Sequence, residues 1–252
     1  MDPLPGLPAN LWDNMAAYLR GITTSLGGRP AAVLVISGHW EMPQPTVNTA
    51  AHPPLLFDYS GFPEHTYRLT YPAAGSPELA ARVRTLLSEA GIPSGDEHDR
   101  GLDHGVFVPF KLIYPAADVP MVQLSLNRNR DAGTHLALGR ALAPLRDEQV
   151  LIVGSGMSYH NLREFFVDRP DVNQAAEDFD RWLNEAATEP DVKLRATRLG
   201  EWRHAPGAHA SHSTPEHLLP LLVAAGAAGD DAARRTYHDQ LMGKPVSGFQ
   251  FG

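Results

Sequence analysis

The chain has 252 residues, of which 43% are hydrophobic, and a formal net charge of −8. This is enough apolar material for one large domain, expected to span residues 1–252, with a full core. The 21 Lys and Arg residues are dispersed, so we expect a small-molecule substrate, not a nucleic acid or an anionic membrane surface. Because there is no cysteine, any metal must be held by nitrogen and oxygen ligands.

The amino-terminal segment MDPLPGLPANLW has neither the basic stretch nor the apolar stretch of a signal peptide. No apolar run approaches the roughly 18 residues of a membrane span. The sequence therefore predicts a soluble cytoplasmic protein, either a monomer or a homodimer.

Three short apolar runs predict strands that are buried on both faces of a parallel sheet. They are Ala31 to Ser37, Val119 to Leu126, and Val150 to Val153. Gly38 ends the first run and Gly154 ends the third.

Helices are predicted between and after these strands. Ser76 and Pro77 open one that runs to Gly91, and Leu138, Leu142 and Leu145 mark a second. A third has its apolar stripe between Ala176 and Ala186, and a fourth is predicted to start at Thr214, with His217 in its first turn. Alternating strands and helices indicate an α/β fold with a central, mainly parallel or mixed sheet flanked by helices.

Two further segments lack a clear period. Residues His52 to Pro72 are rich in proline and aromatic residues, which favours a long ordered loop with a function. Residues Ala224 to Ala233 form the one low-complexity stretch, interpreted as a surface connection.

Four histidines follow apolar runs or occupy glycine-rich turns: His39 in VLVISGHWE, His104 in GLDHG, His160 in VLIVGSGMSYHN and His217 in STPEHLLP. Ligands of open α/β sheets bind at the carboxyl ends of the strands, where His39 and His160 are expected. Each alone is more often a hydrogen-bonded structural group. Together they favour a metal site, because imidazole is a common ligand for zinc and iron.

The other two positions are more ambiguous. His104 could line a substrate site with Asp103 supporting it from behind, or GLDHG could simply form a turn. His217 could project into the site or could cap its helix. Ser155 is not expected to be a nucleophile, since the Gly-x-Ser-x-Gly pattern is absent. Most of the remaining histidines considered are expected in loops or at the surface: His52, His65, His98, His204, His209, His212 and His238.

As a set, five segments in this order resemble the class III extradiol ring-cleavage dioxygenases, in the 4,5-DOPA dioxygenase-like branch of the LigB-like superfamily. They are VLVISGHWE, PPLLFDYSGFPEHTYRLTYPAAGSPELAARV, GLDHGVFVPFKLIYPAADVPMVQLSL, VLIVGSGMSYHNLREF and TPEHLLPLLVAAGAA. The resemblance covers nearly the whole chain.

The resemblance implies a non-haem metal centre, with Fe(II) for catalysis and zinc in some isolated proteins, that cleaves a small catecholic ring with O2. It maps His39 and His217 onto metal ligands. His160 maps onto a histidine that is close to the metal and acts as the acid or base. His104 maps onto a histidine on the substrate side of the site.

One departure from the family pattern concerns the amino-terminal segment. The family begins with a strand and a His-Gly-rich loop that supplies the first metal histidine, whereas no histidine precedes His39 here. The chain as written is therefore expected to have one metal ligand fewer.

Two alternatives use the same residues. A non-enzymatic binding protein of the Memo type shares the superfamily. A zinc-dependent hydrolase would need a carboxylate base near the metal, for which Glu41 and Glu216 are the candidates.

Overall fold

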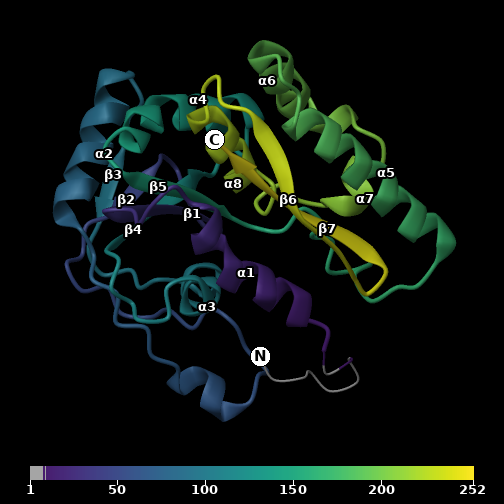
Figure 1. Ribbon diagram of the computed structural model, residues 1–252, viewed down its shortest axis with the longest axis horizontal. Coiled ribbons are helices and arrows are strands. Elements are labelled where there is room, and N and C mark those ends of the chain that lie inside the picture. Colours follow the sequence, from purple (N-terminus) through teal and green to yellow (C-terminus); the bar gives the residue numbers. More distant parts are fainter. Residues whose placement is uncertain (1–7, 9) are drawn as a thin grey trace.

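The computed structural model describes Pro8 and residues 10–252; expectations for residues 1–7 and 9 lie outside this part. The chain forms an α/β domain around a five-stranded sheet of order β3–β2–β4–β1–β5 (Figure 1). The strands are β1 (Ala32–Met42), β2 (Thr46–Asn48), β3 (Gly95–Glu97), β4 (Met121–Asn127) and β5 (Val150–Ser155).

The three strands predicted from apolar runs lie side by side, with β1 between β4 and β5 and parallel to both. The other pairings make the sheet mixed, because β2 is antiparallel to β4 and parallel to β3. The expected α/β architecture with a mainly parallel or mixed sheet is therefore confirmed.

Strand β1 separates two apolar layers because its side chains alternate between the faces of the sheet. Leu34 and Ile36 enter one layer with residues of α2 (Pro77–Glu89), α4 (Ala132–Leu142) and α8 (Leu219–Ala227). Val33 and Val35 enter the other layer with residues of α1 (Asp13–Ser25) and α3 (His104–Ile113). Both faces of the sheet are thus covered by helices (Figure 1), which explains why this strand is almost wholly apolar.

The predicted helix signals have clear structural counterparts. The Ser76 side chain accepts a hydrogen bond from the Leu79 amide at 3.2 Å, and Pro77 is the first residue of α2. The second predicted helix is α4, continued by the 3-10 turn η2 (Ala143–Arg146). The third is α5 (Pro170–Ala187).

The helix expected to start at Thr214 begins later, at Leu219, so His217 lies in a turn that precedes α8. The physical reason is Pro220, which lacks an amide hydrogen and is tolerated only in the first turn of a helix. The surface connection expected at Ala224 to Ala233 is wrong for its first half only, since exposed residues such as Gly229 and Asp230 do connect α8 to the next strand. Its first half belongs to α8, where Ala225 and Ala227 are buried.

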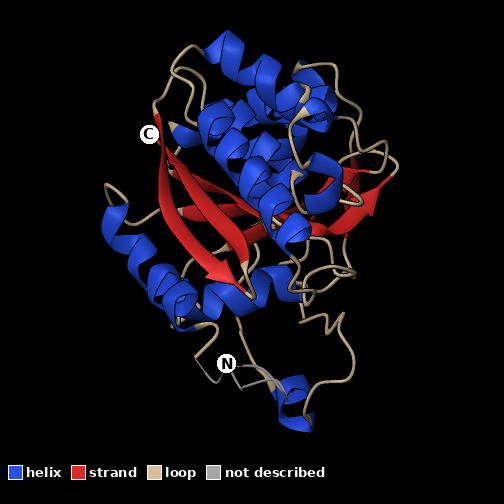
Figure 2. Cartoon of the chain, turned by 90° about the vertical axis from the view of Figure 1, so that its right-hand side faces the viewer, coloured by secondary structure: helices blue, strands red, loops and turns tan. Residues whose placement is uncertain are grey.

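The carboxyl-terminal region adds a two-stranded antiparallel hairpin of β6 (Ala233–Leu241) and β7 (Lys244–Phe251). It packs beside α1 and α5 as a long twisted ribbon (Figures 1 and 2). The remaining elements are α6 (Val192–Gly200), α7 (Ala208–Ser211), η1 (Glu64–Arg68) and η3 (Trp202–His204). In the described part of the chain, none of the helices has the length and apolarity needed to cross a bilayer.

Candidate active site

His39 is placed by an irregularity in β1. Pairing with β5 ends at Ser37, and the register with β4 shifts between Ile36 and Glu41. Gly38 was expected to end this strand and to leave His39 just beyond it. Instead, β1 continues to Met42, so His39 lies within the strand. The Ser37 hydroxyl accepts the His39 amide hydrogen at 3.2 Å. The histidine thereby leaves the regular sheet at the carboxyl end of the β1–β5 pairing.

The four histidines singled out from the sequence form one continuous row of rings. Ring centroids lie 4.0 Å apart for His104 and His39, 5.0 Å for His39 and His217, and 3.4 Å for His217 and His160. The last pair is stacked, with 12° between the ring planes. His39 and His160 therefore lie well within the distance of about 12 Å that contacts around one metal could span.

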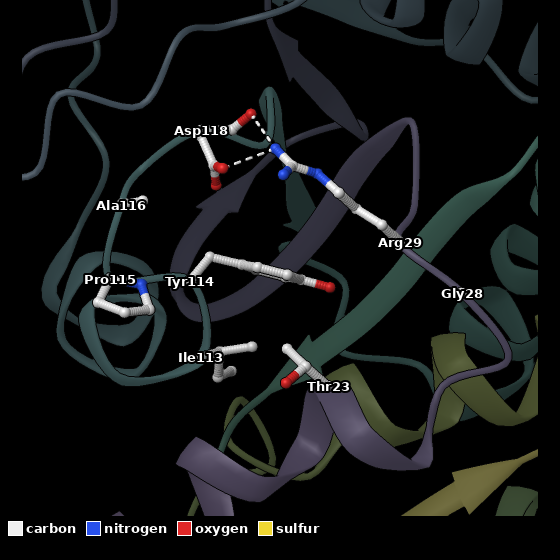
Figure 3. Close-up of a pocket in the computed structure, with 8 residues that line it drawn as sticks. All are labelled: Thr23, Gly28, Arg29, Ile113, Tyr114, Pro115, Ala116 and Asp118. Atoms are coloured by element: carbon white, nitrogen blue, oxygen red, sulfur yellow. Dashed lines mark hydrogen bonds and ion pairs between the residues drawn. The ribbon is translucent and has the colours of Figure 1, made fainter.

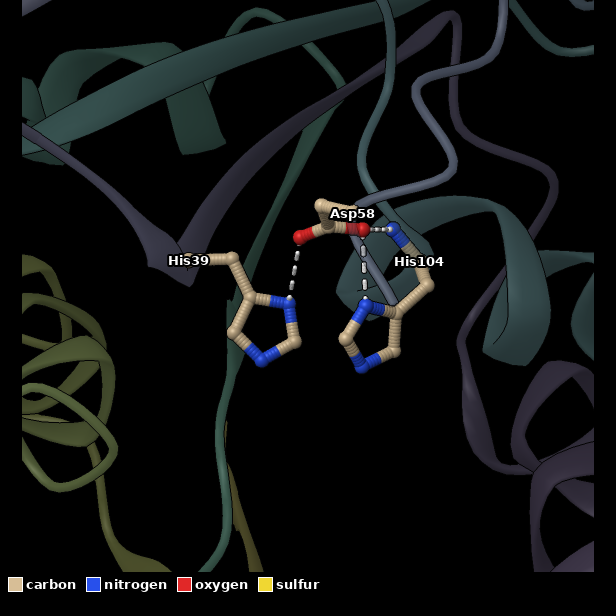
Figure 4. Close-up of side chains that lie close together, drawn as sticks. All are labelled: His39, Asp58 and His104. Carbon is tan, nitrogen blue, oxygen red and sulfur yellow. Dashed lines mark hydrogen bonds and ion pairs between the residues drawn. The ribbon is translucent and has the colours of Figure 1, made fainter. Parts of the chain in front are cut away.

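At one end of the row, Asp58 faces His39 and His104 (Figure 4). Its Oδ1 accepts hydrogen bonds from the His104 backbone amide at 2.9 Å and from His104 Nδ1 at 2.7 Å. Its Oδ2 lies 3.4 Å from His39 Nδ1. Burial raises the pKa of Asp58, but the hydrogen bonds from His104 outweigh it and the net pKa is lowered.

Asp103 lies behind His39 and is completely buried. Its carboxylate accepts hydrogen bonds from the side chains of Ser37, Gln123 and Arg100, and Oδ1 lies 3.6 Å from His39 Nδ1. Burial acts to raise the pKa of Asp103, yet His39, Gln123 and Ser37 lower it to about 2. The carboxylate expected to support His104 therefore faces His39 instead.

At the other end of the row, Glu216 lies beside His160 and His217. Its Oε1 accepts a hydrogen bond from the Thr214 hydroxyl at 2.9 Å and is 3.7 Å from His160 Nδ1. Burial raises the pKa of Glu216, but contacts with His160 and Thr214 lower it to about 2. Burial, reinforced by the neighbouring imidazoles, lowers the pKa of His217 to about 2, so this ring is neutral near pH 7.

Glycines let the segment that carries Glu216 and His217 approach the sheet. A Cβ on Gly156 would lie 2.1 Å from the His217 carbonyl oxygen, and one on Gly38 would lie 3.0 Å from that of Glu216. On the opposite side, a Cβ on Gly105 would meet the Ser37 hydroxyl at 2.7 Å. The glycine-rich contexts noted in the sequence are therefore sites of close backbone packing around the histidines.

His212, which was expected at the surface or in a loop, is almost completely buried. Its Nε2 lies 2.9 Å from the Ser158 carbonyl oxygen, and its ring packs edge-on against Phe179 and Trp202. A backbone bridge joins it to His160. The sequence does not reveal the burial of His212, because the segment HAPGAHASHS is polar and contains glycine. Nothing in it indicates that its last histidine turns inward.

The donor set fits a metal ion. Two groups, His39–Asp58–His104 and His160–Glu216–His217, each bring three ligand atoms within 4.8 Å of one another. Within the described residues, His217 Nδ1 and Glu216 Oε2 are buried and have no hydrogen-bond partner. Unpaired buried polar atoms of this kind are costly, and coordination of a cation would satisfy them.

The surface pocket shown in Figure 3 lies elsewhere, between the end of α1 and the end of α3, with a volume of about 330 Å³. The exposed ion pair Arg29–Asp118 borders it at 2.8 Å. No histidine lines this pocket, so its chemistry is unrelated to the histidine row.

An α/β sheet with a row of imidazoles and carboxylates at the ends of its strands defines a protein with a candidate metal centre. A family model described as "Catalytic LigB subunit of aromatic ring-opening dioxygenase" matches residues 2–249. The chain belongs to this LigB family and is an extradiol ring-cleavage dioxygenase. This family is metal-dependent.

Named relatives agree with the family. The chain is 42% identical to a 4,5-DOPA dioxygenase extradiol of Beta vulgaris, an alignment that covers 87% of this chain and 81% of the relative. It is 36% identical to the protein of that name from Escherichia coli K12, over 79% and 73% of the two chains. The crystal structure of an uncharacterized Escherichia coli K12 protein matches with a TM-score of 0.78 at 30% identity, covering 99% and 94%.

Proposed function

We propose that this protein is an Fe(II)-dependent extradiol dioxygenase that cleaves the ring of a small catechol with O2 to a semialdehyde product. The observation that carries the proposal is the single row of four imidazoles, which has a carboxylate at each end. Such a row combines neutral nitrogen ligands for a metal with groups that can accept and donate protons.

His39 and His217 would hold the metal, with His160 close to it. His39 presents Nδ1 to the carboxylates of Asp58 and Asp103. Metal-binding histidines typically have such an acceptor behind the nitrogen that does not coordinate. His217 is buried, neutral and without a partner for Nδ1 among the described residues. Bound iron would supply the one-electron chemistry that allows a catechol to react with O2.

His160 would act as the acid and base. Its Nδ1 faces Glu216 at 3.7 Å, and an ionised carboxylate in that position stabilises the imidazolium formed when the ring takes a proton. Its Nε2 is then the atom that accepts the proton of a catechol hydroxyl and later returns a proton to the product.

His104 would line the substrate side of the site. Its ring meets Tyr59 edge-on, with centroids 5.5 Å apart, and Phe57 and Phe107 pack next to Tyr59. An aromatic wall beside an imidazole suits a flat catecholic ring, because aromatic groups favour edge-to-face and offset contacts.

The hydrolase alternative needs one carboxylate base, and neither of its two candidates is suited to that role. Glu41 is held in a bidentate pair by Arg130, with both contacts at 2.7 Å. Glu216, with its pKa lowered to about 2, is a poor proton acceptor near neutral pH.

The test is turnover by the chain reconstituted with Fe(II) under nitrogen. Dihydroxyphenylalanine is the first substrate to try, because it is part of the names of several relatives, followed by a panel of catechols. On exposure to air, oxygen consumption and the yellow absorbance of a ring-cleaved product should rise together. The zinc-loaded protein is the matched control, because zinc has no redox chemistry.

Stoichiometric iron and catechol binding without oxygen consumption would contradict the proposal and favour a binding protein. Release of a hydrolysis product with zinc would favour the hydrolase.

A further inference from the structure

The long loop expected at His52 to Pro72 is fixed to the segment that precedes α3. The Leu56 amide donates to the Leu102 carbonyl and the Leu102 amide donates to the Pro54 carbonyl, both at 2.8 Å. The approach is close, because a Cβ on Gly101 would lie 2.7 Å from the Pro54 oxygen. Residues after Leu56 are thus held at a defined position beside α3.

Asp58 is the residue of this loop that reaches the histidine row. In Figure 4 both rings lie on the same side of its carboxylate, with each Nδ1 directed toward Asp58 and each Nε2 directed away from it. Oδ1 receives two hydrogen bonds from His104. Oδ2 is 3.4 Å from His39 Nδ1, within ion-pair distance, and this nitrogen has no hydrogen-bond partner among the described residues. A single carboxylate therefore faces one nitrogen of each of two neighbouring rings.

The chemistry of a carboxylate limits what these nitrogens can be. An ionised carboxylate only accepts hydrogen bonds, so a ring nitrogen that bonds to it must carry a hydrogen. In a neutral imidazole the other nitrogen then has a free lone pair. The bond to Asp58 therefore fixes this tautomer for His104. For His39, whose Nδ1 faces Oδ2 without a hydrogen bond, the negative charge of the carboxylate favours the same tautomer.

Asp103 is much less suited to this double role. Its two oxygens already accept from Ser37, Gln123 and Arg100, and it lies behind His39 only. It also precedes α3 without capping it through its side chain. The first amide of α3, that of His104, is bonded by Asp58 instead.

We propose that Asp58 is a positioning residue that sets the orientation and tautomer of His39 and His104 together. This inference rests on the proposed function, in which His39 holds the metal and His104 lines the substrate side. One substitution in the loop should then weaken both metal binding and catechol binding. An exclusively structural role would leave both unchanged once the protein is folded.

The test variant is Asp58→Asn. Asparagine keeps the size and one acceptor oxygen, so the bond to the His104 amide and the folded loop can persist. Its NH2 group, however, donates toward one ring nitrogen and cannot accept from it. We expect zinc affinity, measured by chelator competition, to fall about 10- to 100-fold, the usual cost of removing such a partner. The KM of the iron enzyme for the catechol should rise in the same variant.

The matched control is Glu64→Gln, which removes a carboxylate from the same loop. Glu64 is exposed and pairs only with Arg68 in the contacts of the described structure, so this variant should bind zinc and catechol like the wild type. The thermal midpoint of both variants is measured to establish that they are folded.

A spectroscopic readout reports the tautomers directly. Long-range 1H–15N correlation spectra of the metal-free protein should show hydrogen on Nδ1 of His39 and His104. The signals are assigned by their absence in His39→Gln and His104→Gln. In Asp58→Asn at least one of the two rings should change tautomer, while the ring of buried His135, bonded to the backbone at both nitrogens, should not.

The outcomes separate this inference from the proposed function. If His39→Ala retains zinc, the proposed metal centre itself is wrong. If His39→Ala loses zinc but Asp58→Asn matches Glu64→Gln in affinity, KM and tautomers, the role of Asp58 is overturned. Should Asp58→Asn not fold, Asp58→Glu and Asp58→Ala replace it. Because Asp58→Glu keeps the negative charge, this variant should bind zinc more tightly than Asp58→Ala. Equal zinc affinities of the two variants would overturn the inference.

Discussion

The two ends of the histidine row are built by different means. Around His39 and His104, two carboxylates, Asp58 and Asp103, face two rings, and hydrogen bonds link them to several segments of the chain. Around His160 and His217 the described residues provide one carboxylate, Glu216, and the two rings are stacked on each other.

The second end also depends on backbone packing. The turn before α8 lies so close to β1 and β5 that only glycine fits at positions such as Gly154 and Gly156. Acceptors thus orient the first end and steric fit orients the second. At the first end, carboxylates orient the imidazole nitrogens. At the second end, nitrogens are buried and have no hydrogen-bond partner among the described residues. A metal ion can bind nitrogen ligands of both kinds.

The largest expected effect tests whether the two ends form one centre. His39→Ala and His217→Ala should each lose metal, because removal of either ring leaves too few nitrogen ligands for a divalent ion. Metal content is measured after dialysis by elemental analysis. His98→Ala is the control, since His98 is exposed and contacts the Thr49 hydroxyl.

Retention of half the wild-type metal in each variant would indicate two independent sites, one at each end. Unchanged content in both variants would remove these histidines as ligands.

The next effect separates proton transfer from binding. His160→Ala should lower kcat by about 10²- to 10⁴-fold, the usual contribution of a general acid or base, with the catechol KM changed only a few-fold. Steady-state kinetics with the iron-loaded protein provide both values. Normal turnover would exclude His160 as the acid and base. An effect confined to KM would place it on the substrate side, like His104.

The sequence was informative where apolar periodicity and strand ends decide the structure. The runs at Ala31, Val119 and Val150 predict the three adjacent parallel strands β1, β4 and β5, and the ends of these runs point to His39 and His160. Histidine is chemically distinctive, so its positions at these ends could be combined into a hypothesis about one site.

The sequence was much less informative where a contact depends on tertiary packing. Asp58 lies in a loop without periodicity, and no local pattern indicates which carboxylate meets which ring. His212 is buried by Phe179 and Trp202, which belong to other elements. The strand β6 was missed because its residues alternate too weakly between apolar and polar types to indicate a strand, as ARRTYHDQL shows.

Steric fit at the second end can be tested with Gly156→Ala. A Cβ there would lie 2.1 Å from a backbone oxygen of His217, so the turn before α8 must move. We expect a loss of about 3 kcal/mol in the free energy of unfolding, at the upper end of overpacking costs. Urea denaturation measures it. Gly21→Ala in α1 is the control, because a Cβ added at Gly21 would have no neighbouring atom within 4 Å. Alanine also stabilises a helix by roughly 0.5–1 kcal/mol relative to glycine.

If both glycine variants unfold at the wild-type urea concentration, close backbone packing does not hold the second end. Loss of stability without loss of metal would show that the turn can shift while His217 keeps its position.

The smallest effect concerns acid stability and His212, which supports the second end from behind. Burial lowers the pKa of His212 from 6.5 to about 4, so below pH 6.5 the unfolded chain binds a proton that the native chain does not. Stability contributed by the neutral ring is therefore present above pH 6.5 and is lost as the pH falls toward 4. The loss is at most about 3 kcal/mol for a shift of this size.

Urea unfolding of the metal-free protein between pH 7.5 and about pH 4 should show this decline. It should be flatter in His212→Gln, which keeps a donor for the Ser158 carbonyl but does not titrate. Asp58→Asn should leave the slope between pH 6.5 and 5 nearly unchanged, because the first end is held by carboxylates whose pKa values are lowered. A slope that is equally steep in wild type and His212→Gln would mean that another group causes the acid sensitivity.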